Sequence, residues 1–176
     1  QVRTMAVSPG YFEVLGASSL QGRDFDERDG TSGRLALIVS RRFAQTHWPK
    51  GDALGARIRL YAGSTAGPWL TVVGVAPDLR QGDPAQAEID PVVYVPLRQR
   101  PARGAWVLAR TAVPPQRLRA DMRRVVQNVH PEVPLWLGPY TLAEWRAGNY
   151  WRRGVNSGLA LTFAVAALVI AAVGLF

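Results

Sequence analysis

The sequence predicts a mixed α+β domain that is followed by a transmembrane helix. Two observations support this prediction. Up to residue 153, short apolar or alternating runs typical of strands are interspersed with helical patterns, without a repeat of fixed period. From Gly154 to Phe176 the chain then has no charged residue. We therefore expect a domain over residues 1–153, with at least five strands and three helices, and a membrane span over residues 154–176.

The first elements follow from alternation and capping signals. Val2–Val7 alternates apolar and polar residues, which predicts a strand. Ser8 is expected to be the N-cap of a short helix, with Pro9 at its first position. The apolar residues of this helix lie between Tyr11 and Leu15, and Gly16 is expected to end it.

A buried strand and a capped helix are predicted next, after a polar stretch. Asp26–Arg34 is acidic and polar and predicts an exposed loop. Leu35–Val39 is a short apolar run, which indicates a buried strand. Ser40 is expected to cap a helix that carries Phe43, Ala44, His47 and Trp48 and that ends at Pro49.

Four further strands are predicted in the middle of the chain. Arg57–Tyr61 alternates, with Ile58 and Leu60 expected to point inward, and Gly63–Pro68 is expected to connect a hairpin. The other strand predictions are Trp69–Ala76, which has the strongest pattern, Val92–Leu97 and Trp106–Arg110.

An amphipathic helix is predicted after Pro114-Pro115. Its apolar residues fall on one stripe, and His130-Pro131 is expected to end it. The stripe comprises Leu118, Met122, Val125, Val126 and Val129. A short strand is predicted at Leu135–Leu137, and Thr141 and Glu144 have the spacing of a capping box that starts the next helix.

The membrane span is predicted from 18 nearly uninterrupted apolar residues. Leu159–Phe176 contains only one polar residue, Thr162, and as a helix it would extend roughly 27 Å. That length approaches the roughly 30 Å of a bilayer's hydrocarbon core. A buried soluble helix would normally carry a polar stripe, which this segment lacks on every face.

The net charge of +8 comes from arginine, since Lys50 is the only lysine among 21 basic residues. Four arginines belong to the amphipathic helix: Arg117, Arg119, Arg123 and Arg124. They could contact phosphates, but no recognised nucleic-acid-binding motif accompanies them. We interpret them as a solvated helix face and expect no nucleic-acid partner.

No motif for catalysis, cofactor binding or metal binding is found in the sequence. Lys50 lacks the glycine spacing of a P-loop. His47 and His130 are far apart and outside any metal-ligand spacing, and the chain has no cysteine. The acidic cluster of Asp24, Asp26, Glu27 and Asp29 lacks the register of a calcium loop and is expected to be solvated. We therefore expect no catalytic residue, no cofactor and no metal.

Six segments, in their order and spacing, together resemble the extracytoplasmic domain of MacB-like ABC-transporter permeases, most of all the duplicated permeases common in acidobacteria. The segments are Val7–Gly16 (VSPGYFEVLG), Leu20–Phe25, Leu35–Pro49 (LALIVSRRFAQTHWP), Gly55–Leu60, Trp69–Arg80 (WLTVVGVAPDLR) and Pro91–Gln99 (PVVYVPLRQ). The sequence departs from the family at Ala53, where proline is frequent, and at Ala17-Ser18, where a large aliphatic residue is usual. Both positions are expected in loops or at edges, so they affect turns rather than the fold.

The resemblance implies a porter-like α/β part with an inserted β-rich part, followed by an FtsX-like membrane region. It implies a non-enzymatic domain that couples membrane-helix motion, driven by a cytoplasmic ABC ATPase, to a substrate or partner protein on the outer side. It also implies a bacterial inner-membrane location and a permease dimer or a second permease half. Arg152 and Arg153 would then lie outside, against the positive-inside rule, which is weak next to a long domain.

Two other classes of function stay open. The first is a cytoplasmic basic domain that is tethered to the membrane and binds anionic lipid or nucleic acid, as the net charge and the flanking arginines would allow. The second is an enzyme, which would need a pocket with convergent carboxylates.

Overall fold

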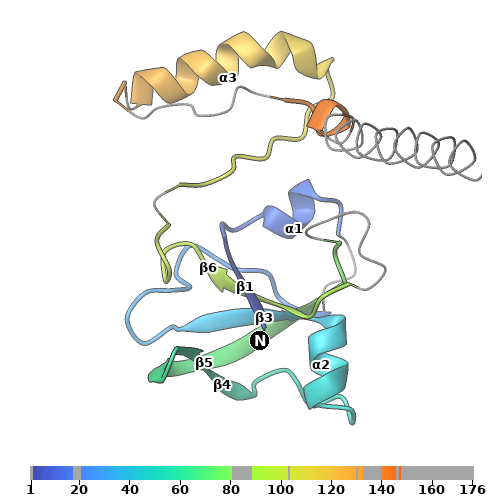
Figure 1. The fold of residues 1–176 in the computed structure, drawn as a ribbon, viewed down its shortest axis with the longest axis vertical. Helices are drawn as coiled ribbons and strands as arrows, with labels where there is room; N and C mark the ends of the chain where they lie inside the picture. The colour runs from blue at the N-terminus through green and yellow to red at the C-terminus, as the bar shows by residue number, and fades with distance from the viewer. Residues whose placement is uncertain are drawn as a thin grey trace, which may run out of the picture. The chain divides into compact units, whose positions relative to one another are not determined.

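The computed structural model describes residues 2–17, 21–80, 89–102, 104–129, 131–132, 140–145 and 147. The chain divides into two compact units, Gln1–Arg110 and Thr111–Phe176. The first unit contains the sheet, and the second contains the long helix α3 (Figure 1).

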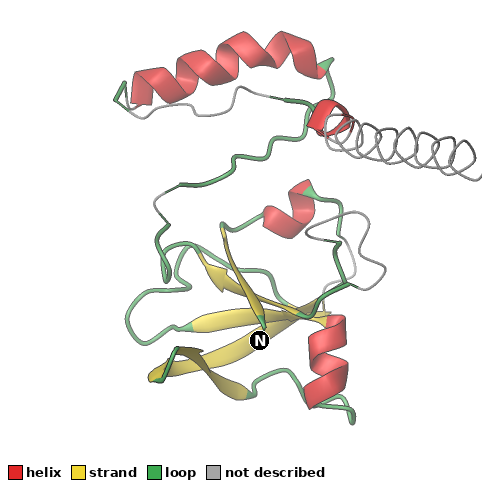
Figure 2. Cartoon of the chain, viewed as in Figure 1, coloured by secondary structure: helices red, strands yellow, loops and turns green. Residues whose placement is uncertain are grey.

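One mixed sheet of six strands forms the first unit (Figure 2). The strands are β1 (Arg3–Val7), β2 (Gln21–Gly22), β3 (Ala36–Ser40), β4 (Arg57–Ala62), β5 (Thr65–Ala76) and β6 (Val92–Pro96). Their order is β1-β6-β3-β5-β2, and β4 pairs with β5. The pairs β1–β6 and β3–β5 are parallel, whereas β3–β6, β2–β5 and β4–β5 are antiparallel.

This architecture confirms a mixed sheet with helices. All six described strands belong to the same sheet. The β4–β5 ribbon continues this sheet, because β5 is long enough to pair with β4 at its start and with β2 and β3 at its end. The expected inserted β-rich part stays a prediction.

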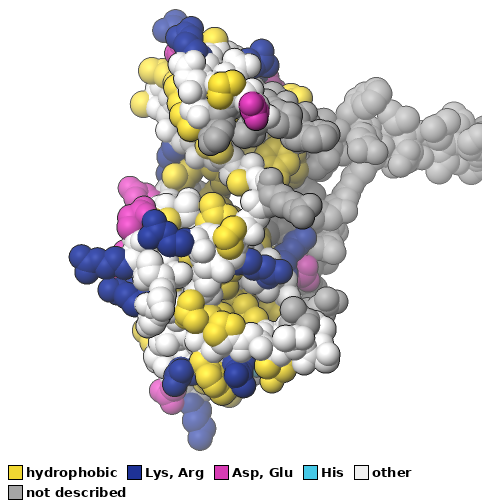
Figure 3. All heavy atoms as spheres, turned by 90° about the vertical axis from the view of Figure 1, so that its left-hand side faces the viewer, with side chains coloured by type: hydrophobic (Ala, Val, Ile, Leu, Met, Phe, Trp, Pro, Cys, Tyr) yellow, Lys and Arg dark blue, Asp and Glu magenta, His cyan; other side chains and the backbone are white. Residues whose placement is uncertain are grey.

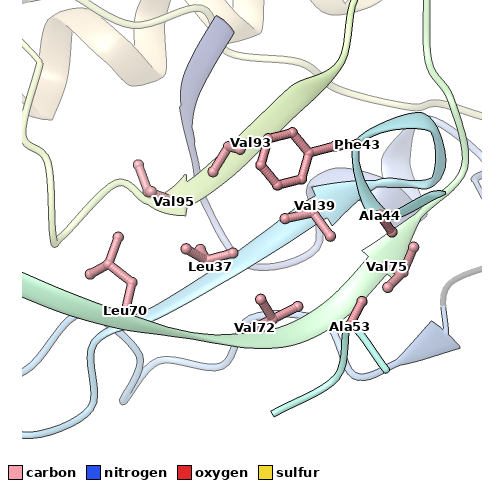
Figure 4. Packing of buried hydrophobic residues seen from close by; sticks show 10 residues of the cluster. All are labelled: Leu37, Val39, Phe43, Ala44, Ala53, Leu70, Val72, Val75, Val93 and Val95. Atoms are coloured by element: carbon pink, nitrogen blue, oxygen red, sulfur yellow. The ribbon is translucent and has the colours of Figure 1, made fainter. Parts of the chain in front are cut away.

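The central strand β3 is buried on both faces, which explains its continuous apolar run. Alternate side chains of a strand point to opposite faces, so Leu37 and Val39 join one core cluster and Ala36 and Ile38 join the other. Helix α2 (Arg41–His47) contributes Phe43 and Ala44 to the first cluster, together with residues of β5 and β6 (Figure 4).

Helix α1 (Tyr11–Val14) contributes to the second cluster through an aromatic contact. The ring of Phe12 meets the ring of Tyr94 edge-on, with their centroids 5.0 Å apart, and both side chains are fully buried. Such pairs add about 0.5–1.5 kcal/mol beyond the burial of their area. The sheet therefore has a separate apolar core on each of its faces.

The predicted cap of α2 is confirmed. The Ser40 hydroxyl accepts a hydrogen bond from the Phe43 amide at 3.3 Å, which is the N-cap geometry. The same oxygen accepts a second hydrogen bond, at 3.1 Å, from the amide of Val92 at the start of β6. Ser40 is buried, so this one hydroxyl satisfies two backbone donors that water does not reach.

The prediction that Ser8 caps α1 is wrong. The helix begins at Tyr11, and its N-cap is Gly10, which has a left-handed φ of 77° and makes no side-chain cap. Instead, the Ser8 carbonyl oxygen accepts a hydrogen bond from the Tyr11 amide at 3.3 Å, and this bond closes a turn before the helix. A glycine at this position can adopt positive φ at no steric cost, so the turn competes successfully with a serine cap.

Two strand boundaries also differ from the prediction. β5 begins at Thr65 rather than at Trp69, because Thr65 pairs with Ala62 across a two-residue turn. The predicted strand Trp106–Arg110 is wrong, since no strand is found there and Trp106 and Val107 remain 70% and 71% exposed. Residues with high strand propensity form a strand only where a neighbouring strand pairs with them.

The amphipathic helix of the second unit is confirmed as α3 (Pro115–Val129). Leu118, Met122 and Val126 are half-buried along its apolar stripe, whereas Val125 and Val129 are exposed. Residues 142–145 and 147 are also helical.

Three predictions of the C-terminal part lie outside the described residues. They are His130, the strand Leu135–Leu137 and the membrane span over residues 154–176. None of the helices in the described ranges has the length and apolarity that a membrane crossing requires.

Candidate functional site

The capping box predicted at Thr141 and Glu144 is formed in the second unit. The Glu144 amide donates to the Thr141 hydroxyl at 3.1 Å, and the Thr141 amide donates to Glu144 Oε2 at 2.9 Å. Two backbone donors that would lack partners at a helix start are thereby satisfied reciprocally. The box fixes the start of the helix over residues 142–145.

Helix α3 reaches this cap through an ion pair. One terminal nitrogen of Arg119 donates to both carboxylate oxygens of Glu144. Glu144 thus accepts from Arg119 on α3 and from Thr141 in its own cap at the same time. The hydrogen bond from Arg119 and then that from the Thr141 backbone lower the pKa of Glu144 from 4.5 to about 2. We name this cluster of Arg119, Thr141 and Glu144 the helix junction.

The Glu144 carboxylate of the helix junction is occupied by its hydrogen-bond donors. A saturated carboxylate with a depressed pKa is a poor general base at neutral pH, because it is ionised and already engaged by its donors. The hydrogen bonds of Arg119 to Glu144 join α3 to the helix over residues 142–145.

The other arginines of α3 divide into paired and exposed residues. Arg124 donates to Asp121 at 3.1 Å, one turn away on the same helix, while Arg117 and Arg123 are exposed. Since Arg119 is engaged at the helix junction, two of the four arginines are already bound to carboxylates. The helix therefore does not present all four as a continuous row of unpaired cations.

The acidic cluster contains one residue, Asp29, for which the predicted solvent exposure is wrong. Asp29 is only 2% exposed, contrary to the expectation of a solvated loop, whereas Asp26 and Glu27 are exposed as predicted. Arg23 donates to both oxygens of Asp29, at 2.6 and 2.8 Å, and the Asp26 amide donates at 2.9 Å. Burial opposes ionisation of Asp29, but these hydrogen bonds dominate and lower the pKa of its carboxyl.

The burial of Asp29 follows from a contact that is distant in the sequence. The next residue, Gly30, packs so closely on Gln99 that an added Cβ would lie 2.9 Å from the Gln99 amide nitrogen. Arg98 also donates to the carbonyl of Glu27 at 2.9 Å. The loop therefore lies against the segment after β6, and the Arg23–Asp29 pair is a structural clamp of the sheet unit.

A model of the protein family described as "MacB-like periplasmic core domain" matches residues 1–125, which is more than half of the chain. The chain belongs to this family. The match covers the whole sheet unit and α3 as far as Val125, and it ends before the helix junction is complete at Glu144.

Two solved structures are similar to this MacB-like domain. The periplasmic region of MacB from Actinobacillus actinomycetemcomitans is 16% identical, with a TM-score of 0.49 over 73% of this chain and 56% of that chain. A domain of a putative permease protein from Porphyromonas gingivalis is 19% identical, with a TM-score of 0.43 over 80% of this chain and 69% of that chain. The chain thus spans just over half of the MacB periplasmic region. No curated protein matches it.

His47 of the MacB-like domain has a packing role. Its ring stacks on Phe43 with centroids 4.1 Å apart, and its Nδ1 lies 3.0 Å from the Phe43 carbonyl oxygen. Lys50 lies in the turn after α2. Within the described ranges, no group of three or more His, Asp or Glu side chains is arranged to hold a metal ion.

Proposed function

We propose that this MacB-like domain is the extracytoplasmic part of an ABC-transporter permease, with the domain over residues 1–153 and a membrane span over residues 154–176. The observation that carries the proposal is the family match over residues 1–125. The apolar run Leu159–Phe176 supports it, because it is long enough for a bilayer. The domain would then belong to a protein of the bacterial inner membrane.

In this proposal the domain is a non-catalytic transmitter of motion. A cytoplasmic ABC ATPase would move the membrane helices, and the domain would pass that motion to a substrate or a partner protein outside. A second permease half or a second copy would complete the transporter. The helix junction supports this role, because it holds α3 on the helix that precedes the span.

The location is tested by alkaline phosphatase fusions in the protein as the cell makes it, since that reporter is active only outside the cytoplasm. We expect activity from a fusion before Trp151 and none from a fusion after Phe176. The opposite pattern would overturn the proposal in favour of the membrane-tethered cytoplasmic domain.

The coupling is tested by inserting Gly-Ser between Trp151 and Gly158 in the assembled transporter. Because this chain has no cysteine, spin labels can be placed at Arg100→Cys and Gln127→Cys, one in each unit. We expect the distance between the labels to change on ATP binding in the parent protein and to stay constant in the insertion variant. An unchanged response after the insertion would contradict rigid coupling.

A further inference from the structure

The β4–β5 ribbon carries a cationic and aromatic surface on its outer side. Ile58 and Leu60 pack against the core, so the alternate residues of β4 point away from it. We name the exposed residues Arg57, Arg59, Tyr61 and Trp69 the basic–aromatic face. Tyr61 is 65% exposed and Trp69 is 47% exposed, which is high for residues of their size. Basic side chains lie beside hydrophobic ones at the lower end of Figure 3, which is the end where Figure 1 places β4, β5 and α2.

The arginines of this face are held in place by the protein. Arg59 is the cross-strand partner of Trp69, and its guanidinium carbon lies 4.9 Å from the ring centroid. The guanidinium carbon of Arg57 lies 5.7 Å from the same ring. Such cation–π contacts restrict the side chains without using up their hydrogen-bond donors. The Nε–H of Arg59 donates to the Gly67 carbonyl at 3.1 Å, and this is the one hydrogen bond of its guanidinium found among the described residues.

The ribbon backbone is shaped to allow this arrangement. The register of β4 and β5 shifts between Arg59 and Tyr61, opposite Gly67. A Cβ at Gly67 would lie 2.8 Å from the Leu60 carbonyl oxygen, so the close approach of the two strands requires glycine here. Over the described residues, no carboxylate forms an ion pair with Arg57 or Arg59. Among the described residues, these two charges are therefore positioned without a carboxylate partner.

The outer edge of β4 is also available. In the described part of the sheet, β4 pairs with β5 alone, so the backbone groups on its other side have no strand partner. An unpaired edge strand is a template for the addition of another strand. The open edge and three residues of the basic–aromatic face, Arg57, Arg59 and Tyr61, belong to the same strand, Arg57–Ala62.

We infer that β4 binds an extended acidic segment of a partner protein by strand addition, with alternate carboxylates of that segment placed beside Arg57 and Arg59. Charge complementarity favours an acidic partner, and the open backbone edge favours a peptide over a lipid headgroup or a nucleic acid, neither of which can pair with a strand. Arg57 and Arg59 would give specificity, because they would pair with carboxylates at every second position of the bound segment. Main-chain hydrogen bonds between that segment and the edge of β4 would add affinity. That this partner lies on the outer side of the membrane rests on the proposed function. The binding of an acidic segment to β4 does not depend on it.

The test uses the full chain in a neutral detergent and a fluorescein-labelled ten-residue peptide of alternating Glu and Val, followed by fluorescence anisotropy. We expect saturable binding that Arg57→Gln/Arg59→Gln weakens at least about ten-fold, the loss of two charge-assisted contacts at a surface. The matched control, Arg117→Gln/Arg123→Gln, removes the same charge from exposed positions of α3 and should change the affinity less than about two-fold. Circular dichroism and thermal unfolding establish that both variants are folded.

A second probe separates strand pairing from charge attraction. The same peptide with a methyl group on every backbone nitrogen keeps every carboxylate but has no backbone N–H left to donate to the edge of β4. We expect it to bind at least about ten-fold more weakly. Equal binding by both peptides, or an equal loss in both double variants, would overturn the inference in favour of net-charge attraction.

Two further outcomes would also overturn it. If the peptide does not bind, β4 is not a docking strand for an extended acidic segment. If phosphatidylglycerol vesicles bind and lose binding in Arg57→Gln/Arg59→Gln while the peptide stays unbound, the face is a lipid contact. Neither result bears on the proposed permease function, which fails separately if the phosphatase fusions give the reverse orientation.

Discussion

Two ion pairs of arginine with a carboxylate stabilise the two units in different settings. In the sheet unit, the Asp29 side chain is 1% exposed and receives both terminal nitrogens of Arg23. At the helix junction, the Glu144 side chain is 45% exposed and receives one nitrogen of Arg119. The same chemistry thus clamps a loop onto a core in one unit and links two helices near solvent in the other. A buried pair is costly to break, whereas an exposed pair can be adjusted.

The two units also differ in how far their apolar residues are buried. Every residue of β3 and β6 is buried, whereas α3 has no fully buried residue. We therefore expect the sheet unit to resist deformation and the helical unit to respond to local changes, as the proposed transmission of motion would require. Four experiments test this contrast.

The largest effect is expected from Leu37→Ala in β3. Leu37 is fully buried in the core cluster, so its truncation leaves a cavity and should lower the free energy of unfolding by about 3–4 kcal/mol. The measurement is urea unfolding of the full chain followed by circular dichroism. The control Val125→Ala, at an exposed site on α3, should cost less than about 0.5 kcal/mol. Similar losses from both variants would contradict the contrast.

The next effect is expected from Asp29→Asn. It removes the charge that accepts two hydrogen bonds from Arg23, so the free energy of unfolding should fall by about 2 kcal/mol. Arg23 is partly exposed and can be rehydrated, which keeps the loss below that of a fully buried pair. The control Glu27→Gln changes an exposed carboxylate of the same loop and should have little effect in the same urea titration. An equal loss of unfolding free energy in Glu27→Gln would show that the Arg23–Asp29 pair is not what holds the loop.

A smaller and local effect is expected from Thr141→Ala. The substitution removes the hydroxyl that accepts from the Glu144 amide, at a cost of about 1 kcal/mol to the helix over residues 142–145. Hydrogen exchange measured by NMR should show faster exchange of the Glu144 amide, with unchanged protection in β3 and β6. Faster exchange in those strands would show that the helix junction stabilises the sheet unit as well.

The smallest effect is expected from acid and salt at the helix junction. The pKa of Glu144 is lowered from 4.5 to about 2, so its ionised form stabilises the folded state above pH 4.5, and this contribution is lost as the pH falls toward 2. The pKa of Asp29 is also lowered, with the same sign. Carboxyl NMR titration should show that 0.5 M NaCl raises the pKa of Glu144 more than that of Asp29, because salt screens exposed pairs more than buried ones. An equal rise of both pKa values in salt would contradict the conclusion that one ion pair is exposed and the other buried.

Local patterns predicted the elements whose stabilising contacts lie within a few residues. Ser40 caps the amide three residues later, and Thr141 and Glu144 form their box over the same distance, so both caps could be recognised in the sequence. The continuous apolar run of β3 likewise indicated burial on both faces.

Predictions failed where distant contacts decide the structure. The burial of Asp29 depends on Gly30 packing against Gln99, and the strand pattern of Trp106–Arg110 has no pairing strand among the described residues. The basic–aromatic face was also missed, although the alternation of Arg57–Tyr61 was recognised, because the facing position of Trp69 depends on strand register. Register is a property of the pairing and not of either strand alone.

The place of β6 in the sheet has a consequence for the order of folding. β6 lies between β1 and β3, and its parallel partner β1 is joined to it by Arg3↔Val92 through Val7↔Pro96. During synthesis β1 therefore leaves the ribosome long before the strand that it pairs with, and both apolar faces of β3 stay incompletely covered until Val92–Pro96 follows. Pairing over so many residues is slow, because the closure of a long loop precedes any gain from contacts. We expect the sheet unit to complete its folding in one late step, so that a nascent chain stalled before β6 becomes a client of chaperones.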